Sequence, residues 1–272
     1  MPLGGHPNGL IGPALSALDL GPDDEMVVVL NGPEGQAVPG LTDRARLVEA
    51  RELRSSYYAR NAGVRATSAP WILFLDGDCE PSADLIDRYF LPAPDERTGA
   101  LAGRVDPADG EEGLLGVHAR TRGLLDQEAF LARDKPFAVT ANLLVRRGAW
   151  EQLGGFREVR SAGDVDFSWR LADAGWKIGY RPEAIVEHRH RVRLGEFLRQ
   201  RVRYGGGAAW LQEQHPGARP EPRPLRGMAR SALGAAGALV RGRTQEAGLK
   251  AVDALGYAAH GLGARRSNLP AG

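Results

Sequence analysis

Two short apolar runs place the strongest constraint on the fold of this chain. EMVVVL occupies residues 25–30 and WILFL occupies residues 71–75. Runs without polar alternation are typical of strands buried on both faces, as in a parallel sheet that helices cover. The first run ends at the turn sequence NGP, and the second continues directly into the acidic tripeptide DGD at residues 76–78.

The segments around these runs predict strands that alternate with helices. Helices are expected over residues 10–18, 41–66, 81–90, 148–153 and 165–174, with Gly175 closing the last, and residues 113–132 are expected to be a helix or a mobile segment. Further strands are expected over residues 101–105, 138–146, 177–180 and 184–187. This alternation predicts an α/β fold with a Rossmann-like, mostly parallel sheet and right-handed crossovers.

The tripeptide at residues 76–78 places two carboxylates at the end of a buried strand. In open parallel sheets this end faces the ligand crevice, and Mg²⁺ or Mn²⁺ is commonly held there by carboxylates and substrate phosphates. Gly77 would allow a nucleotide to approach the backbone closely. An acidic turn that caps a helix near Pro81 explains the same residues, and the tripeptide alone does not decide between these interpretations.

Two further polar positions support a site. Asp164 and Asp166 lie at the start of an expected helix, where either could be an N-cap or a general base toward an acceptor hydroxyl. His188 follows a strand-like run and could join Asp78 as a metal ligand, although a lone histidine is more often a surface residue.

Composition and charge narrow the class of protein. The chain is 43% hydrophobic and 25% charged, and its single cysteine, Cys79, excludes an internal disulfide framework. From Arg189 onward there are 15 Lys and Arg against 5 Asp and Glu, whereas the preceding part has 20 against 29. A basic tail suggests contact with phosphates or a lipid surface. Nucleic acid is not expected, because no zinc finger or aromatic RNA-binding motif is present.

The tail also suggests a division of the chain. Residues 214–226 are rich in proline and predict a linker between a domain at residues 1–213 and a tail at residues 227–272. Residues 228–240 and 245–263 predict two helices without the run of about 20 apolar residues that a membrane span needs. They form either an interfacial amphipathic hairpin or helices that pack back on the domain.

Four blocks together resemble the family 2 glycosyltransferases, which have the GT-A fold. They are ARNAGVRATSAPWILFLDGDCEP (59–81), ANLLVRRGAWEQLGGF (141–156), GDVDFSWRLADAGWKIGYRPEAIVEH (163–188) and QRVRY (200–204). The resemblance implies that Asp76 contacts the ribose side of a nucleotide and that Asp78 binds a metal bridging its diphosphate. It places Asp164 as the catalytic base and His188 as a metal or diphosphate ligand.

The resemblance implies further binding residues. Arg60 and Asn61 would pack beside the nucleotide. Gln200, Arg203 and Tyr204 resemble the Q-x-x-R-W motif near the acceptor and diphosphate, with tyrosine in place of tryptophan. Asn142 and Asp166 would shape the acceptor or sugar pocket.

The implied activity is inverting transfer of a sugar from a nucleotide-diphosphate donor to an acceptor hydroxyl, with Mn²⁺ or Mg²⁺. No secretory leader is recognised, so a cytoplasmic protein is expected. The basic tail adds two expectations: a lipid-linked acceptor, and an anionic membrane surface at which the protein is peripheral.

Three departures from the family pattern keep a second interpretation open. MPLGGHPNGL stands where the family has a first buried strand, Leu30 and Asn31 stand where it often has an aspartate, and Gly163 replaces a glutamate. The start codon is then misplaced, or the sheet lacks a strand. A non-catalytic GT-A-like partner subunit of a glycan-assembly complex is therefore the alternative. A sugar-phosphate nucleotidyltransferase would show a glycine-rich basic loop near the amino terminus, and the sequence shows none.

Overall fold

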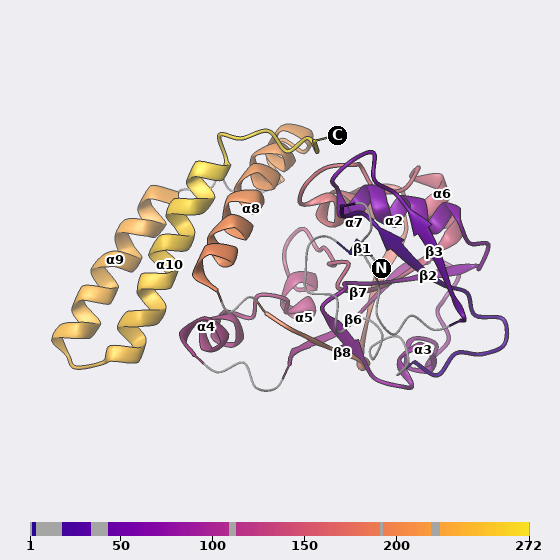
Figure 1. Cartoon of the computed structure of the whole chain (residues 1–272), viewed down its shortest axis with the longest axis horizontal. Helices are drawn as coiled ribbons and strands as arrows, with labels where there is room; N and C mark the ends of the chain where they lie inside the picture. The colour runs from indigo at the N-terminus through magenta and orange to yellow at the C-terminus, as the bar shows by residue number, and fades with distance from the viewer. Residues whose placement is uncertain are drawn as a thin grey trace. The chain divides into compact units, whose positions relative to one another are not determined.

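The computed structural model of the chain describes residues 2–3, 18–33, 43–108, 113–190, 193–218 and 224–271. The chain forms two compact units, whose elements are labelled in Figure 1. The first unit contains Met1–Asp106, Leu125–His188 and Leu269–Gly272, and the second contains Pro107–Leu124 and Arg189–Asn268. The main division thus falls after His188, ahead of the proline-rich segment at residues 214–226.

The strands of the first unit form two sheets. One sheet is parallel and has the order β1 (Pro2–Leu3), β2 (Met26–Leu30), β3 (Ala45–Glu49). The other has the order β4 (Trp71–Leu75), β7 (Asn142–Arg146), β6 (Thr98–Pro107), β8 (Lys177–His188), β5 (Cys79–Pro81). The strand pairs β4–β7, β6–β7 and β5–β8 are antiparallel.

The expected α/β class is confirmed, but the expected mostly parallel sheet is wrong, because the strand pairs β4–β7, β6–β7 and β5–β8 of the larger sheet are antiparallel. An apolar run indicates that both faces of a strand are covered by other elements. It does not indicate whether the neighbouring strand is parallel or antiparallel. Pairing such as Trp71 with Arg146 and Leu75 with Asn142 joins segments that are far apart in the chain.

The helices of the first unit are α2 (Ser56–Arg65), α3 (Leu85–Tyr89), α5 (Gln127–Leu131), α6 (Arg147–Gln152) and α7 (Gly163–Asp173). The start of α2 is determined by Ser55, whose hydroxyl accepts hydrogen bonds from the amides of Tyr57 and Tyr58. The expected end of α7 is confirmed, since Gly175 follows it with a φ of +86°.

Several expected boundaries are wrong. Residues 41–66 contain the strand β3 before α2, and residues 81–90 begin at the last residue of β5. Residues 113–132 form two helices, and the strands expected at 177–180 and 184–187 are one strand, β8. The helix expected at 10–18 falls almost entirely outside the described residues.

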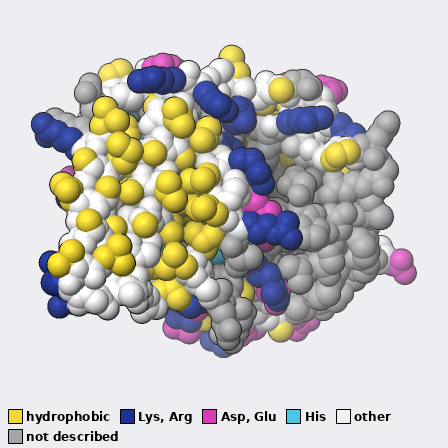
Figure 2. All heavy atoms as spheres, turned by 60° about the vertical axis from the view of Figure 1, so that its left-hand side comes forward, with side chains coloured by type: hydrophobic (Ala, Val, Ile, Leu, Met, Phe, Trp, Pro, Cys, Tyr) yellow, Lys and Arg dark blue, Asp and Glu magenta, His cyan; other side chains and the backbone are white. Residues whose placement is uncertain are grey.

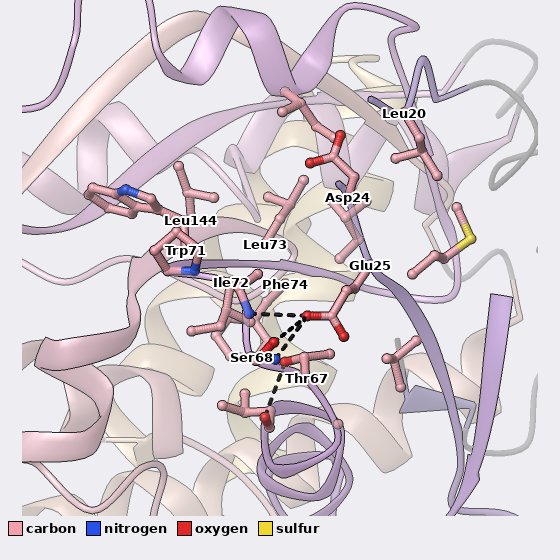
Figure 3. Close-up of a pocket in the computed structure, with 18 of the residues that line it drawn as sticks. Leu20, Asp24, Glu25, Thr67, Ser68, Trp71, Ile72, Leu73, Phe74 and Leu144 are labelled. Carbon is pink, nitrogen blue, oxygen red and sulfur yellow. Dashed lines mark hydrogen bonds between the residues drawn. The ribbon is translucent and has the colours of Figure 1, made fainter. Parts of the chain in front are cut away.

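An apolar cavity of about 550 Å³ lies between β2 and β4 (Figure 3). At one end the Glu25 carboxylate accepts hydrogen bonds from the Ser68 amide at 2.9 Å and the Ala69 amide at 3.1 Å. The starts of β2 and β4 therefore lie at the same end of the cavity. Among the described strands, β1 pairs with β2 only at Val29 and Leu30, and β4 pairs only with β7. The cavity separates the two sheets.

The second unit is helical. Its described helices are α4 (Leu114–Arg122), α8 (Leu194–Gln214), α9 (Pro224–Val240) and α10 (Thr244–Gly263). The two helices expected in the tail are confirmed as α9 and α10. Helices α8 and α10 pack backbone to backbone, because a Cβ at Gly205 would lie 2.0 Å from the His260 carbonyl oxygen. None of the described helices combines the length and apolarity needed to cross a bilayer.

Candidate functional site

The acidic tripeptide forms a turn between β4 and β5, and the pairing of β5 brings it to the end of β8. Cys79 lies opposite His188 in the β5–β8 register. This places the Asp78 carboxylate 3.3 Å from Nε2 of His188. Two side chains that are 110 positions apart in the sequence thus meet at one edge of the sheet, as the sequence predicts.

Asp78 and His188 are suitable ligands for a divalent cation. Their ligand atoms and the Cys79 sulfur all lie within 4.8 Å of one another. In an octahedral site with bonds of about 2.1 Å, neighbouring ligand atoms are about 3 Å apart, close to the observed separation of Asp78 and His188. A carboxylate oxygen and an imidazole nitrogen are both acceptable to Mn²⁺.

Cys79 is the poorest ligand of the three. Its thiol is buried and donates to the Ala141 carbonyl oxygen at 3.4 Å. Burial, and then the carboxylates of Asp76 and Asp78, raise the pKa of this thiol well above its usual value. The protonated sulfur packs in the core cluster with residues such as Leu75 and Val186, so Asp78 and His188 remain as the cation pair.

Arg60 connects the acidic turn to a second carboxylate. Its guanidinium, which is almost fully buried, forms an ion pair with Asp76. The positive charge of Arg60 also acts to lower the pKa of Asp164, at the start of α7. Asp76 and Asp164 are therefore both near the Arg60 guanidinium and share one region of the first unit.

Asp164 is held by a residue that the sequence analysis did not single out. The Tyr57 hydroxyl donates to Oδ1 of Asp164 at 2.9 Å, and the Val165 amide donates to the same oxygen at 3.0 Å. Burial and then the charge of Asp164 raise the pKa of Tyr57 well above its usual value, which keeps the hydroxyl protonated as a donor. Tyr57 precedes Arg60 by one helical turn, and residues at i and i+3 lie on the same face of a helix. This spacing was the sequence feature that could have placed Tyr57 beside Arg60 in the site.

The pKa of Asp164 is itself raised. Burial is the dominant cause, and it outweighs the opposing effects of Arg60 and of the hydrogen bonds from Tyr57 and Val165. The residue before α7, Ala162, has a left-handed backbone with a φ of +66°, which is uncommon for alanine. Asp164 is therefore a partly buried carboxyl on a constrained backbone, beside a tyrosine and an arginine.

Three other expected binding residues have fully satisfied, buried side chains. The Asn61 amide bonds both backbone groups of Phe156, at 2.8 and 3.0 Å. The Asn142 amide accepts from the Tyr89 hydroxyl and donates to the carbonyl oxygens of Arg104 and Ala184.

Asp166 has no exposed surface. Its carboxylate forms ion pairs with Arg170 at 2.8 Å and Arg157 at 3.4 Å. Asn61, Asn142 and Asp166 thus hold elements of the first unit together, and their expected contacts with substrate stay predictions.

Gln200, Arg203 and Tyr204 lie on α8 in the second unit. The Gln200 amide donates to the Tyr204 hydroxyl at 3.0 Å, and the Arg203 guanidinium lies 5.6 Å from the centre of the Tyr204 ring. Tyr204 thus interacts with both other motif residues; Arg203 and Tyr204 are exposed, and Gln200 is half-buried.

The cavity between β2 and β4 is distinct from the group of carboxylates and His188 described above. Arg60 and Leu75 line it, but Asp76, Asp78, Asp164 and His188 do not. Its walls are mainly apolar side chains of the two strands, as Figure 3 shows.

Comparison with known families and curated proteins gives consistent matches. The family described as Glycosyl transferase family group 2 matches residues 71–250. Pre-mycofactocin glycosyltransferase of Mycobacterium tuberculosis is 32% identical over 168 residues, which is 58% of this chain and 35% of the relative. Glycosyltransferase AglE of Haloferax volcanii is 28% identical over 63% of this chain and 57% of its own length. The chain thus spans about a third to a little over half of these relatives.

Solved structures share the fold. The mannosyltransferase PcManGT from Pyrobaculum calidifontis, in complex with GDP-Man and Mn²⁺, has a TM-score of 0.63 and 20% sequence identity, over 92% of this chain and 84% of that one. A mycobacterial protein of known structure has a TM-score of 0.53 and 15% identity, over 78% and 72% of the two chains. At these identities the likeness concerns the fold.

Proposed function

Because this chain belongs to glycosyl transferase family group 2, we propose that it transfers a sugar from a nucleotide-diphosphate donor to an acceptor hydroxyl with inversion. The observation that carries this proposal is the cluster in which Arg60 pairs with Asp76 and also acts on Asp164, while Asp78 lies against His188. These side chains come from α2, the β4–β5 turn, α7 and β8, so only the folded chain brings them together.

Asp78 and His188 would hold Mn²⁺ or Mg²⁺. The PcManGT structure contains GDP-Man and Mn²⁺, which supports Mn²⁺ as the first cation to test. When bound, the cation would neutralise charge on the departing nucleoside diphosphate.

Asp164 would accept the proton of the acceptor hydroxyl as that hydroxyl attacks the anomeric carbon. The Tyr57 hydroxyl would orient the Asp164 carboxylate and stabilise its charged form through their hydrogen bond. Arg60, held on α2 beside both carboxylates, would keep Asp76 oriented toward the nucleotide and support the ionised state of Asp164.

Nucleotide binding tests the first part of this proposal. In thermal-shift titrations, UDP or GDP should raise the unfolding temperature only when Mn²⁺ or Mg²⁺ is present, because the diphosphate would bind through the metal. The variant Asp78→Ala should lose this metal-dependent stabilisation and keep the unfolding temperature of the unliganded protein. Equal stabilisation by nucleotide with and without metal would contradict the assignment of Asp78.

Transfer activity tests the second part. A screen of nucleotide sugars for transfer or hydrolysis should identify an active donor, and Asp164→Asn should abolish turnover while nucleotide still binds. Full turnover by Asp164→Asn would contradict its role as the base. Nucleotide binding without any turnover across donors and acceptors would favour the alternative, a non-catalytic partner subunit.

A further inference from the structure

The hairpin of α9 and α10 exposes several of its large apolar side chains. On α9, Leu233 is 75% exposed and Val240 is 88% exposed. The exposed large apolar side chains of the hairpin are Leu225, Leu233, Leu239, Val240, Leu255 and Leu262. On α9 they recur, together with exposed alanines, at 225, 229, 232, 233, 236, 239 and 240, which is one continuous helical stripe.

Most of the buried positions of the same helices are alanine or glycine, and Val252 is the larger exception. Ala235 and Ala238 of α9 are buried, and a Cβ at Gly227 would lie 2.7 Å from the Tyr257 ring. On α10, Gly263 approaches the Val202 carbonyl oxygen of α8 so closely that a Cβ would lie 1.9 Å away. A hairpin stable in water normally buries its large aliphatic side chains, whereas helices that associate in lipid pack through small residues and face the lipid with large ones.

The charges of the hairpin are almost all positive. Residues 224–268 contain seven Lys and Arg against two acids, Glu246 and Asp253. Glu246 pairs with Lys250 at 3.1 Å, and Asp253 pairs with His118 at 2.8 Å and with Arg122. The exposed arginines are Arg226, Arg230, Arg241, Arg243, Arg265 and Arg266. In Figure 2 the apolar side chains form a broad face, and Lys and Arg side chains lie at its borders.

We propose that the outer face of α9 and α10 binds the surface of an anionic lipid bilayer. The helices would lie in the plane of the interface, with Leu233, Leu239 and Val240 among the acyl chains and the arginines at the phosphates. Lying in the interface agrees with the absence of a spanning helix among the described residues. This surface lies within the second unit, and its binding to lipid does not depend on the proposed transfer reaction.

Co-sedimentation of the full chain with vesicles tests the proposal in the absence of nucleotide and metal. The protein should bind vesicles of phosphatidylcholine mixed with phosphatidylglycerol, and bind vesicles of phosphatidylcholine alone at least about tenfold more weakly. Binding to the anionic vesicles should weaken as salt is raised, because screening reduces the attraction between arginine and lipid phosphate.

Two variants separate the apolar and charged contributions. Leu233→Ser with Val240→Ser should lower binding to anionic vesicles by about tenfold or more, because it removes two apolar side chains that would enter the acyl chains. Both side chains are exposed, so the substitutions leave the packed interior unchanged. Arg226→Glu with Arg230→Glu should abolish the preference for anionic lipid. The matched control is Leu91→Ser with Leu269→Ser, which removes two leucines of the first unit that are also largely exposed (67% and 68%) and should bind like the unmodified protein.

Three results would overturn the proposal. The first is no binding to anionic vesicles, and the second is binding that the hairpin variants leave unchanged. The third is a stable dimer in solution that Leu233→Ser with Val240→Ser converts to monomer, since the face would then join two copies of this chain. Circular dichroism should show that each variant retains the helix content of the unmodified protein.

Discussion

Replacing Asn61 by alanine separates a structural role from a nucleotide-binding role at a position where the sequence suggests the latter. In the structure the Asn61 amide donates to the Phe156 carbonyl oxygen at 2.8 Å and accepts from the Phe156 amide at 3.0 Å. A weaker bond reaches Glu158 at 3.3 Å. Phe156 is itself buried, with its ring 4.6 Å from Phe167 and 5.1 Å from Phe74, so water has poor access to the groups that Asn61 satisfies.

The size of the effect follows from these two backbone groups. Each buried group left without a partner costs about 1–3 kcal/mol, so Asn61→Ala should lower the free energy of unfolding by about 2–6 kcal/mol. For a protein of this size, each kcal/mol corresponds to roughly 2–4 °C in Tm. Arg65→Ala, at an exposed position of the same helix, is the control and should change the stability by about 0.5 kcal/mol or less.

Urea unfolding followed by near-UV circular dichroism reports on the aromatic cluster around Phe156. We expect the midpoint of Asn61→Ala to fall well below those of the unmodified protein and of Arg65→Ala. Metal-dependent binding of UDP or GDP, measured at a temperature where the variant is folded, should be retained. An unchanged midpoint combined with lost nucleotide binding would refute this reasoning and place Asn61 in the nucleotide site.

Three further predictions concern the site and the cavity. Transfer requires ionised Asp164, whose pKa is raised, so the transfer rate should fall on acidification at a higher pH than it would with an ordinary aspartate. In pH–rate profiles Tyr57→Phe should move this fall to a still higher pH, since it removes a hydrogen bond that stabilises the carboxylate. Gly163→Ala should reduce transfer and cost about 1–3 kcal/mol in urea unfolding, because its Cβ would lie 2.8 Å from the Tyr57 ring; unchanged kinetics would contradict the positioning role of Tyr57. Apolar β-branched residues added ahead of Pro2 should raise Tm more than a proline-containing extension of equal length, because the β1–β2 register leads them toward the start of β2, which lines the cavity; equal Tm values would contradict this.

Local pattern was sufficient to predict several elements and contacts. The apolar runs predicted β2 and β4, since a strand covered on both faces needs apolar residues throughout its length. The glycine after α7 and the alanine-rich helices of the tail were also recognisable from residue types alone. Asp78 and His188 were expected to meet, and they do.

Other features depended on contacts between distant segments. The strand β3 was misread as helix because ARLVE has good helix formers, and its place beside β2 in the sheet overrides that propensity. Asn61 and Asp166 were expected at the substrate, since polar residues in a motif carry no sign of whether they face a ligand or a backbone group. Only the packing of α2 and α7 showed that both side chains are buried against protein partners.

The sequence by itself determined the class of fold, the acidic turn after β4 and the excess of positive charge in the tail, because each depends on residue type and short spacing. The tertiary structure decided the direction of strand pairing, the hydrogen bond from Tyr57 to Asp164 and the outward orientation of the leucines on α9. These features depend on which surfaces meet across long sequence separations. A periodic pattern shows that a helix has an apolar face, but it does not show whether that face meets protein or lipid.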